Sequence, residues 1–181
     1  APTAAPVVSA PVSSTGQGPE PVRLALPALK IDAPVVQMNW QVVNTAQGPR
    51  SEWVIPKNEA GWHINSARMR EQGNLVISGH NNIYGRVFLK ISQAWDDAPR
   101  VKVDDFTDRS DILKGRTLTL YDAAGNARQY QITDFLRVRD TGVSYEQRVK
   151  NGRFMNPTES EQVTIITCWP PTNNTHRLVV I

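Results

Sequence analysis

Two stretches of alternating residues joined by a turn, between residues 117 and 133, most constrain the fold of this chain. Thr117–Tyr121 and residues 127–133 both alternate apolar and polar side chains, and the segment between them ends in the Gly-Asn pair that hairpin turns favour. Residues 163–167 form an apolar, β-branched run, which predicts a buried strand. Short strands separated by turns, with little helical periodicity, favour an all-β barrel or sandwich.

The first 21 residues differ in composition from the rest of the chain. They are rich in Ala, Pro and Ser, with five prolines and one charged residue, so they cannot bury a core. We expect residues 1–21 to be a disordered linker or stalk, and residues 22–181 to fold as one domain. Such a stalk suits a domain tethered to a membrane segment outside this sequence, and a tail without a role is the alternative.

The charge balance argues against nucleic-acid binding, and the hydropathy argues against a membrane-spanning segment within these 181 residues. The chain has 20 Lys and Arg against 17 Asp and Glu, which gives a formal net charge of only +3, and its basic residues do not cluster. We therefore predict no nucleic-acid binding. No apolar run within the 181 residues approaches the length that spans a bilayer.

Cys168 is the only cysteine, and its position suggests more than packing. It ends the predicted strand 163–167, just before two prolines that stop the strand, and Arg177 opens the next apolar run at residues 178–181. A tight connection would bring the thiol and the guanidinium together, and a nearby cation favours the thiolate. The alternative is a buried, inert cysteine, since free cysteines often only pack.

His80 is the histidine that we expect to work with this thiol. The apolar run at residues 75–77 ends in Ser-Gly-His, so His80 lies at a strand end, as Cys168 does. His63 and His176 are the competing partners, and His176 should face the opposite side of its strand from Arg177. A thiol, an imidazole and a guanidinium together can perform acyl transfer through a thioester.

No metal or organic cofactor is needed for such chemistry. Residues 96–111 contain six aspartates, so a modulating calcium ion is conceivable there. Their spacing does not match an EF-hand loop, and a solvated acidic face is the better interpretation. Just before them, apolar residues at helical spacing predict a helix over residues 88–95.

In several motifs, and in their order along the chain, this sequence resembles the sortases. Residues 164–168, Thr-Ile-Ile-Thr-Cys, are similar to the family's strand that ends in the nucleophile, and Gly79-His80 and Arg177 follow its histidine and arginine motifs. Residues 23–27, 31–35 and 85–88 resemble its opening strands and the segment after its histidine. Lys114-Gly115-Arg116 resembles its hairpin start, with Arg where Asp is usual. The resemblance covers residues 22–181.

The resemblance implies a closed, eight-stranded β-barrel with short helices and long loops, and a catalytic domain over residues 22–181. Cys168 would be the nucleophile, His80 the general acid and base, and Arg177 the oxyanion- or substrate-binding cation. Thr167 would help to hold the substrate. The implied reaction cleaves an LPxTG-like sorting signal between Thr and Gly and joins it to an amine of a cell-wall precursor or a pilin. The implied location is extracytoplasmic, at the cell surface, with a membrane anchor.

Some features depart from the family pattern. Residues 92–113 are longer than the usual link, and the short Cys-to-Arg loop resembles groups other than class B, with classes D, E and F left open. Two other functions compete. An L,D-transpeptidase places His and Gly directly before its Cys, where this chain has Ile166 and Thr167. A non-catalytic, surface-binding β-barrel would contain an unreactive Cys168.

Overall fold

The computed structural model describes residues 16–46 and 48–181, so most of the predicted linker at 1–21 lies outside the described residues. The described part is mainly β-structure. Its strands are β1 Arg23–Leu26, β2 Ile31–Met38, β3 Trp40–Thr45, β4 Gly48–Trp53, β5 Ala60–His63, β6 Gly73–Ser78, β7 Val101–Lys102, β8 Thr107–Ser110, β9 Thr117–Tyr121, β10 Ala127–Gln131, β11 Phe135–Arg139, β12 Glu161–Trp169 and β13 His176–Val180. Its helices are α1 Leu89–Asp96 and α2 Tyr145–Gly152, with short 3₁₀ turns η1 Pro27–Leu29 and η2 Arg153–Met155.

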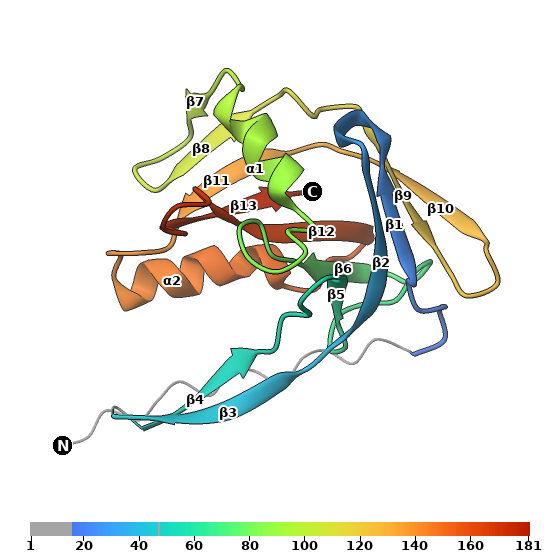
Figure 1. Ribbon diagram of the computed structural model, residues 1–181, viewed down its shortest axis with the longest axis horizontal. Helices are drawn as coiled ribbons and strands as arrows, with labels where there is room; N and C mark the ends of the chain where they lie inside the picture. The colour runs from blue at the N-terminus through green and yellow to red at the C-terminus, as the bar shows by residue number, and fades with distance from the viewer. Residues whose placement is uncertain (1–15, 47) are drawn as a thin grey trace.

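Eleven of these strands form one sheet in the order β10-β9-β1-β2-β5-β6-β12-β13-β11-β8-β7, which Figure 1 shows wrapped around a common centre. Most neighbours are antiparallel, but β6 and β12 are parallel, as are β2 and β5. The predicted hairpin is present as β9 and β10. Strand β1 lies inside the sheet, since it pairs with both β2 and β9.

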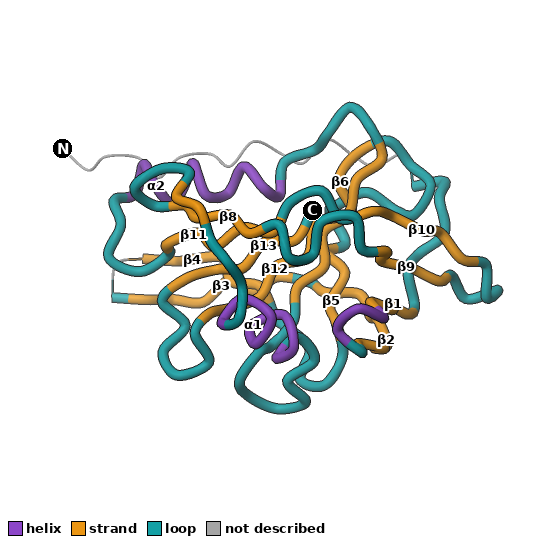
Figure 2. Tube along the Cα trace, turned by 90° about the horizontal axis from the view of Figure 1, so that it is seen from above, coloured by secondary structure: helices purple, strands orange, loops and turns teal. Residues whose placement is uncertain are grey.

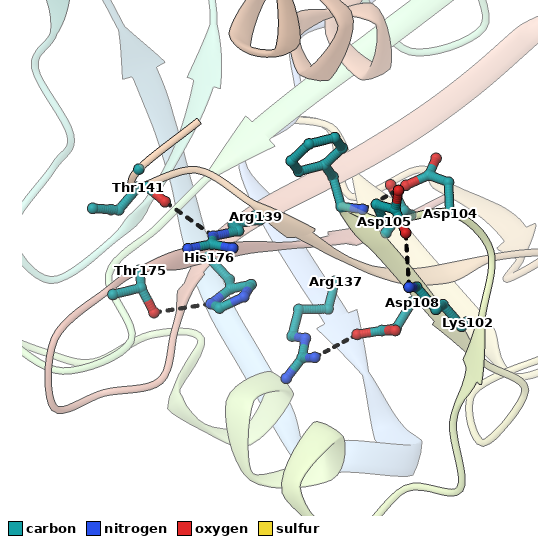
Figure 3. Close-up of a pocket in the computed structure, with 12 residues that line it drawn as sticks. Lys102, Asp104, Asp105, Asp108, Arg137, Arg139, Thr141, Thr175 and His176 are labelled. Carbon is teal, nitrogen blue, oxygen red and sulfur yellow. Dashed lines mark hydrogen bonds and ion pairs between the residues drawn. The ribbon is translucent and has the colours of Figure 1, made fainter. Parts of the chain in front are cut away.

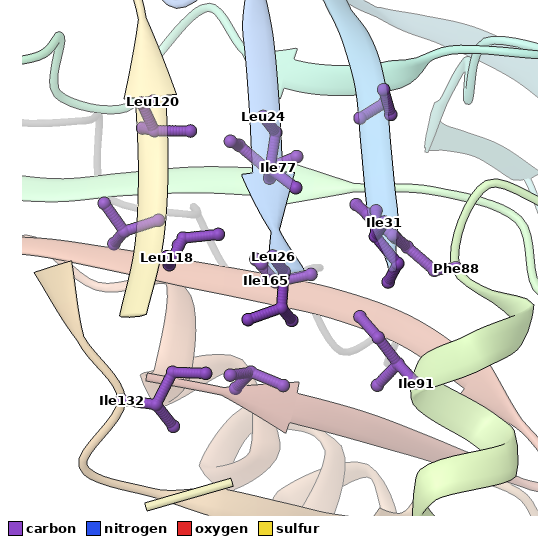
Figure 4. Close-up of a cluster of buried hydrophobic side chains, with 14 of the residues drawn as sticks. Leu24, Leu26, Ile31, Ile77, Phe88, Ile91, Leu118, Leu120, Ile132 and Ile165 are labelled. Carbon is purple, nitrogen blue, oxygen red and sulfur yellow. The ribbon is translucent and has the colours of Figure 1, made fainter. Parts of the chain in front are cut away.

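The sheet curls so that strands far apart in its order share one core. Leu120 of β9, Leu24 of β1 and Ile165 of β12 all point into the same apolar cluster (Figure 4). The two edge strands of this order, β10 and β7, do not pair with each other. Tyr130 Oη on edge strand β10 donates to Glu161 Oε1 on β12 at 2.7 Å, and this side-chain contact links β10 to the middle of the sheet order. The predicted mainly β, barrel-like architecture is confirmed.

The two helices cover opposite sides of strands β11–β13 (Figures 1 and 2). Helix α1 confirms the helix predicted over 88–95, and its Ile91 and Trp95 are buried in the barrel core. Helix α2 begins at the Ser144 cap, whose hydroxyl accepts a hydrogen bond from Gln147 N–H. The 3₁₀ turn that follows it, η2, packs Phe154 against a smaller cluster on the other side of the sheet.

Strands β3 and β4 form a separate two-stranded hairpin that extends away from the barrel (Figure 1). Trp40 is 47% exposed and meets Trp53 edge-to-face, whereas Trp62, on β5, is buried. None of the described residues forms a helix long and apolar enough to cross a membrane.

Candidate active site

The alternation of side chains along β11, β12 and β13 gives this part of the sheet two distinct faces. We call the face that continues into the barrel core, with Phe135, Ile165 and Leu178, the inner face. We call the face with Leu136 and Val179 the outer face. Because successive residues of a strand point to opposite faces, one step along β13 separates outer Arg177 from inner His176.

Cys168 and Arg177 are direct cross-strand partners in the β12–β13 ladder and share the outer face. Arg177 Nη1 donates a hydrogen bond to Cys168 Sγ. The chain turns between them within residues 170–175, where the N–H groups of Asn173 and Asn174 donate to the Pro170 carbonyl. The predicted contact between thiol and guanidinium is confirmed.

The backbone carbonyl of Cys168 is held from the barrel side. Asn81 Nδ2 donates to this oxygen at 2.7 Å, and Ser92 Oγ of α1 donates to it at 3.0 Å. Asn81 is 1% exposed and directly follows His80 in the chain. The segment that carries His80 is therefore tied through Asn81 to the strand end that carries Cys168.

His80 reaches the same end of the barrel through the parallel pairing of β6 with β12, which runs to Ser78 opposite Ile166. Beyond this pair, Gly79 N–H donates to the Ile166 carbonyl at 3.3 Å, and Thr167 Oγ1 donates to the Gly79 carbonyl at 2.8 Å. Thr167 is 2% exposed, and its buried hydroxyl links the end of β6 to the end of β12. A role for its side chain on a substrate stays a prediction.

The local environments set the resting protonation states. Burial raises the pKa of the Cys168 thiol, the Arg177 guanidinium offsets part of this rise, and Asp140 adds to it. The sequence reasoning considered only the cation and missed the larger effect of burial. Burial lowers the pKa of His80, against a hydrogen bond with the Ile55 backbone that raises it. A neutral thiol and a neutral imidazole are therefore the resting pair at neutral pH.

The other two histidines contact residues other than Cys168. His63 is buried, its Nε2 lies 2.7 Å from Ser78 Oγ, and burial lowers its pKa to about 4. His176 faces inward, with its Nδ1 2.9 Å from Thr175 Oγ1 and its ring edge-to-face with Trp169. Among the described residues neither of these histidines contacts the thiol, and His80, whose ring lies 5.3 Å from that of Tyr84, does not contact it either, so the choice of His80 stays a prediction.

A hollow of about 500 Å³ opens on the inner face, around Arg137, Arg139 and His176 (Figure 3). Arg137 forms an ion pair with Asp108 there, and Lys102 forms one with Asp105. Cys168 and Arg177 are not among its lining residues. Within residues 16–46 and 48–181, no three His, Cys, Asp or Glu side chains gather in an arrangement that could hold a metal ion.

Three polar residues around Cys168 were missed by sequence reasoning. Asn81 and Ser92 hold the carbonyl of Cys168, and Asp140 Oδ2 accepts from Arg177 Nη2 at 2.8 Å. Asn81 could have been suspected as the polar neighbour of His80. Asp140 carries no such signal, because only the pairing of β11 with β13 brings it to Arg177.

Comparisons with known proteins agree with this arrangement. The family model described as Sortase domain matches residues 24–181. Sortase A from Corynebacterium diphtheriae, a lid mutant, is 17% identical at a TM-score of 0.55, over 92% of this chain and 71% of that one. Sortase C-1 from Actinomyces oris is 18% identical at a TM-score of 0.55, over 89% and 72%. No curated protein matches in sequence. The predicted fold class and family resemblance are confirmed.

Proposed function

This chain belongs to the sortase family of cysteine transpeptidases, and we propose that Cys168, His80 and Arg177 carry that chemistry here. We further propose that the substrate is an LPxTG-like sorting signal, cleaved between Thr and Gly. The observation that carries the proposal is the hydrogen bond from Arg177 to Sγ of the only cysteine in the chain. A packed, inert cysteine has no need of a cation on its sulfur.

In the first half-reaction, Cys168 Sγ attacks the carbonyl carbon of the threonine in the signal. The thiol proton passes to His80, which rests as a neutral imidazole because burial lowers its pKa. Arg177 stabilises the oxyanion of the tetrahedral intermediate through the guanidinium N–H that rests on Cys168 Sγ, since a cation fixed beside the sulfur suits an anionic oxygen that forms there. The C–N bond then breaks, His80 protonates the leaving glycine amine, and a thioester on Cys168 remains.

In the second half-reaction, an amine attacks the thioester carbon. His80 removes the proton of the incoming amine, the C–S bond breaks with a new amide as product, and His80 returns the proton to the departing Sγ, which regenerates neutral Cys168. The acceptor in this proposal is an amine of a cell-wall precursor or a pilin lysine. The chain itself supplies nucleophile, proton carrier and cation, so the proposal includes no metal or organic cofactor.

The cellular setting follows from the family, whose members work at the cell surface. We place this domain outside the membrane, held at the cell surface by a membrane anchor. The family match runs against both alternative functions, an L,D-transpeptidase and a non-catalytic barrel. Within the proposed site, Thr167 holds the strand end beneath the substrate through its bond to Gly79.

The test is mass spectrometry of the intact protein after incubation with a library of LPxTG-type peptides, with and without an added amine. We expect an acyl adduct on Cys168 with the mass of the peptide up to its threonine, and its conversion to an amide when the amine is present. Cys168→Ala is the matched control and should form no adduct. Reactive Cys168 without any peptide adduct would contradict the substrate class, while an unreactive Cys168 would contradict the enzyme.

A further inference from the structure

Arg177 uses both arms of its guanidinium within the protein. Nη1 donates to Cys168 Sγ, and Nη2 lies 2.8 Å from Asp140 Oδ2. Asp140 directly follows β11 and continues the outward alternation of Leu136 and Val138, so its carboxylate lies on the outer face with the thiol. The three side chains therefore form one chain of contacts on this face.

The backbone of Asp140 is fixed to the start of β13. Its N–H donates to the Thr175 carbonyl at 3.0 Å, and the N–H of Thr141 donates to the same oxygen at 3.0 Å. Two backbone bonds thus set the position of the carboxylate relative to Arg177, two residues after Thr175. A carboxylate held in this way can serve as a fixed point for a longer, more flexible side chain.

Arg177 needs such a fixed point because its side chain is 40% exposed. A long side chain open to water loses conformational freedom when it holds a single contact, and a second charge-assisted bond offsets that loss. We propose that Asp140 is a positioning residue, which fixes the guanidinium of Arg177 on Cys168 Sγ. This inference rests on the proposed roles of Cys168 and Arg177 and adds a residue that acts only through Arg177.

Asp140 also acts directly on the pKa of the Cys168 thiol, and this direct effect is opposite in sign to the effect that Asp140 has through Arg177. Its negative charge raises the pKa of Cys168, while Arg177 lowers it, and the Arg177 effect is the larger. Replacing Asp140 with a neutral residue would lower the pKa of the thiol if only the direct effect counted. If Arg177 also leaves the sulfur, the pKa rises instead, so the sign of the change identifies the role.

The experiment is Asp140→Asn, followed by the rate of Cys168 alkylation with iodoacetamide across pH and by kcat/KM with the cognate sorting peptide. We expect the alkylation curve to move to higher pH, with about a threefold lower rate near pH 7 and about a tenfold lower kcat/KM. Changes of this size match the couplings found for residues in contact. An alkylation curve that stays in place or moves to lower pH overturns the proposal.

Two controls sharpen the result. Asp108→Asn breaks the same kind of Arg–Asp pair on the inner face and should leave the alkylation curve unchanged. In an Arg177→Gln background, Asp140→Asn should have no further upward effect, because its action passes through Arg177. Alkylation requires no sorting peptide, so this readout stands even if no peptide forms a thioester and the proposed function fails.

Discussion

The two faces of strands β11 and β13 carry nearly the same charged groups and differ in what those groups meet. On the outer face, Arg177 pairs with Asp140 and turns its other arm to the thiol of Cys168. On the inner face, Arg137 pairs with Asp108 and lies over the ring of Trp169 at 4.7 Å. One arginine is shared between an anion and a nucleophile, and the other between an anion and an aromatic surface.

This difference means that cavity size alone does not identify the site that we propose around Cys168. The hollow of about 500 Å³ lies on the inner face, while the thiol lies on the other side of the same strands. Arg137 stacks on the rings of Trp95 and Trp169, which is a structural task. Sliding β13 by one residue would exchange the two faces, so the register of the ladder is what assigns Arg177 to Cys168.

The largest expected effect is the loss of all transpeptidation in Cys168→Ala. The variant removes the only thiol, so turnover of a sorting peptide should fall by more than about 10⁴-fold, to the background rate. Cys168 is only partly buried, so a thermal melt should show the fold retained. Residual turnover near the wild-type level would move the chemistry away from the outer face.

Next in size is the loss expected in His80→Ala, set against His176→Ala in the hollow. Removing a general acid and base typically costs about 10²–10⁴ in rate, and we expect a loss in that range for His80. His176→Ala should keep turnover within about twofold, because this residue faces away from Cys168. Steady-state kinetics of both variants decide the assignment, and the reverse order of losses would place proton transfer in the hollow.

The comparison of the two arginines predicts a smaller, still clear effect. Arg177→Lys keeps the positive charge but cannot hold Sγ and Asp140 with two arms, so turnover should fall by about 10²–10³. Arg137→Lys makes the same change in the inner pair and should leave turnover nearly unchanged, with a lower melting temperature from the weakened stacking on Trp169. Equal turnover losses in the two variants would show that the faces are not independent.

The residues of the proposed site could be named from the sequence because their signals are local. A lone cysteine before two prolines, a Gly-His at a strand end and an arginine opening the next strand can each be read from a few neighbouring residues. The β9–β10 hairpin and helix α1 were predictable for the same reason, since a turn and a helical period are short-range patterns. The Cys168–Arg177 contact then follows from a short loop between two strands.

What sequence reasoning missed depends on long-range pairing or on burial. Asp140 meets Arg177 only because β11 pairs with β13, and Asn81 meets Cys168 only because β6 runs parallel to β12. The effect of burial on the thiol pKa was underestimated because burial is a property of the packed barrel. The exposure of Trp40 could not be predicted, because aromatic residues at a hairpin and in a core look alike in sequence.

The last prediction concerns stability below neutral pH, where the buried His63 should dominate and His176 in the hollow, whose pKa burial also lowers, should add a smaller effect of the same sign. Burial lowers the pKa of His63 to about 4, from an unfolded value of 6.5. Between these values the unfolded chain binds more protons, so the free energy of unfolding falls as pH falls, by up to about 3 kcal/mol. His63→Gln keeps a partner for Ser78 but cannot titrate, so it should flatten urea-unfolding free energies between pH 4 and 6.5, whereas His176→Gln should keep most of the wild-type slope. A slope that survives His63→Gln and disappears with His176→Gln would assign the acid sensitivity to the hollow instead.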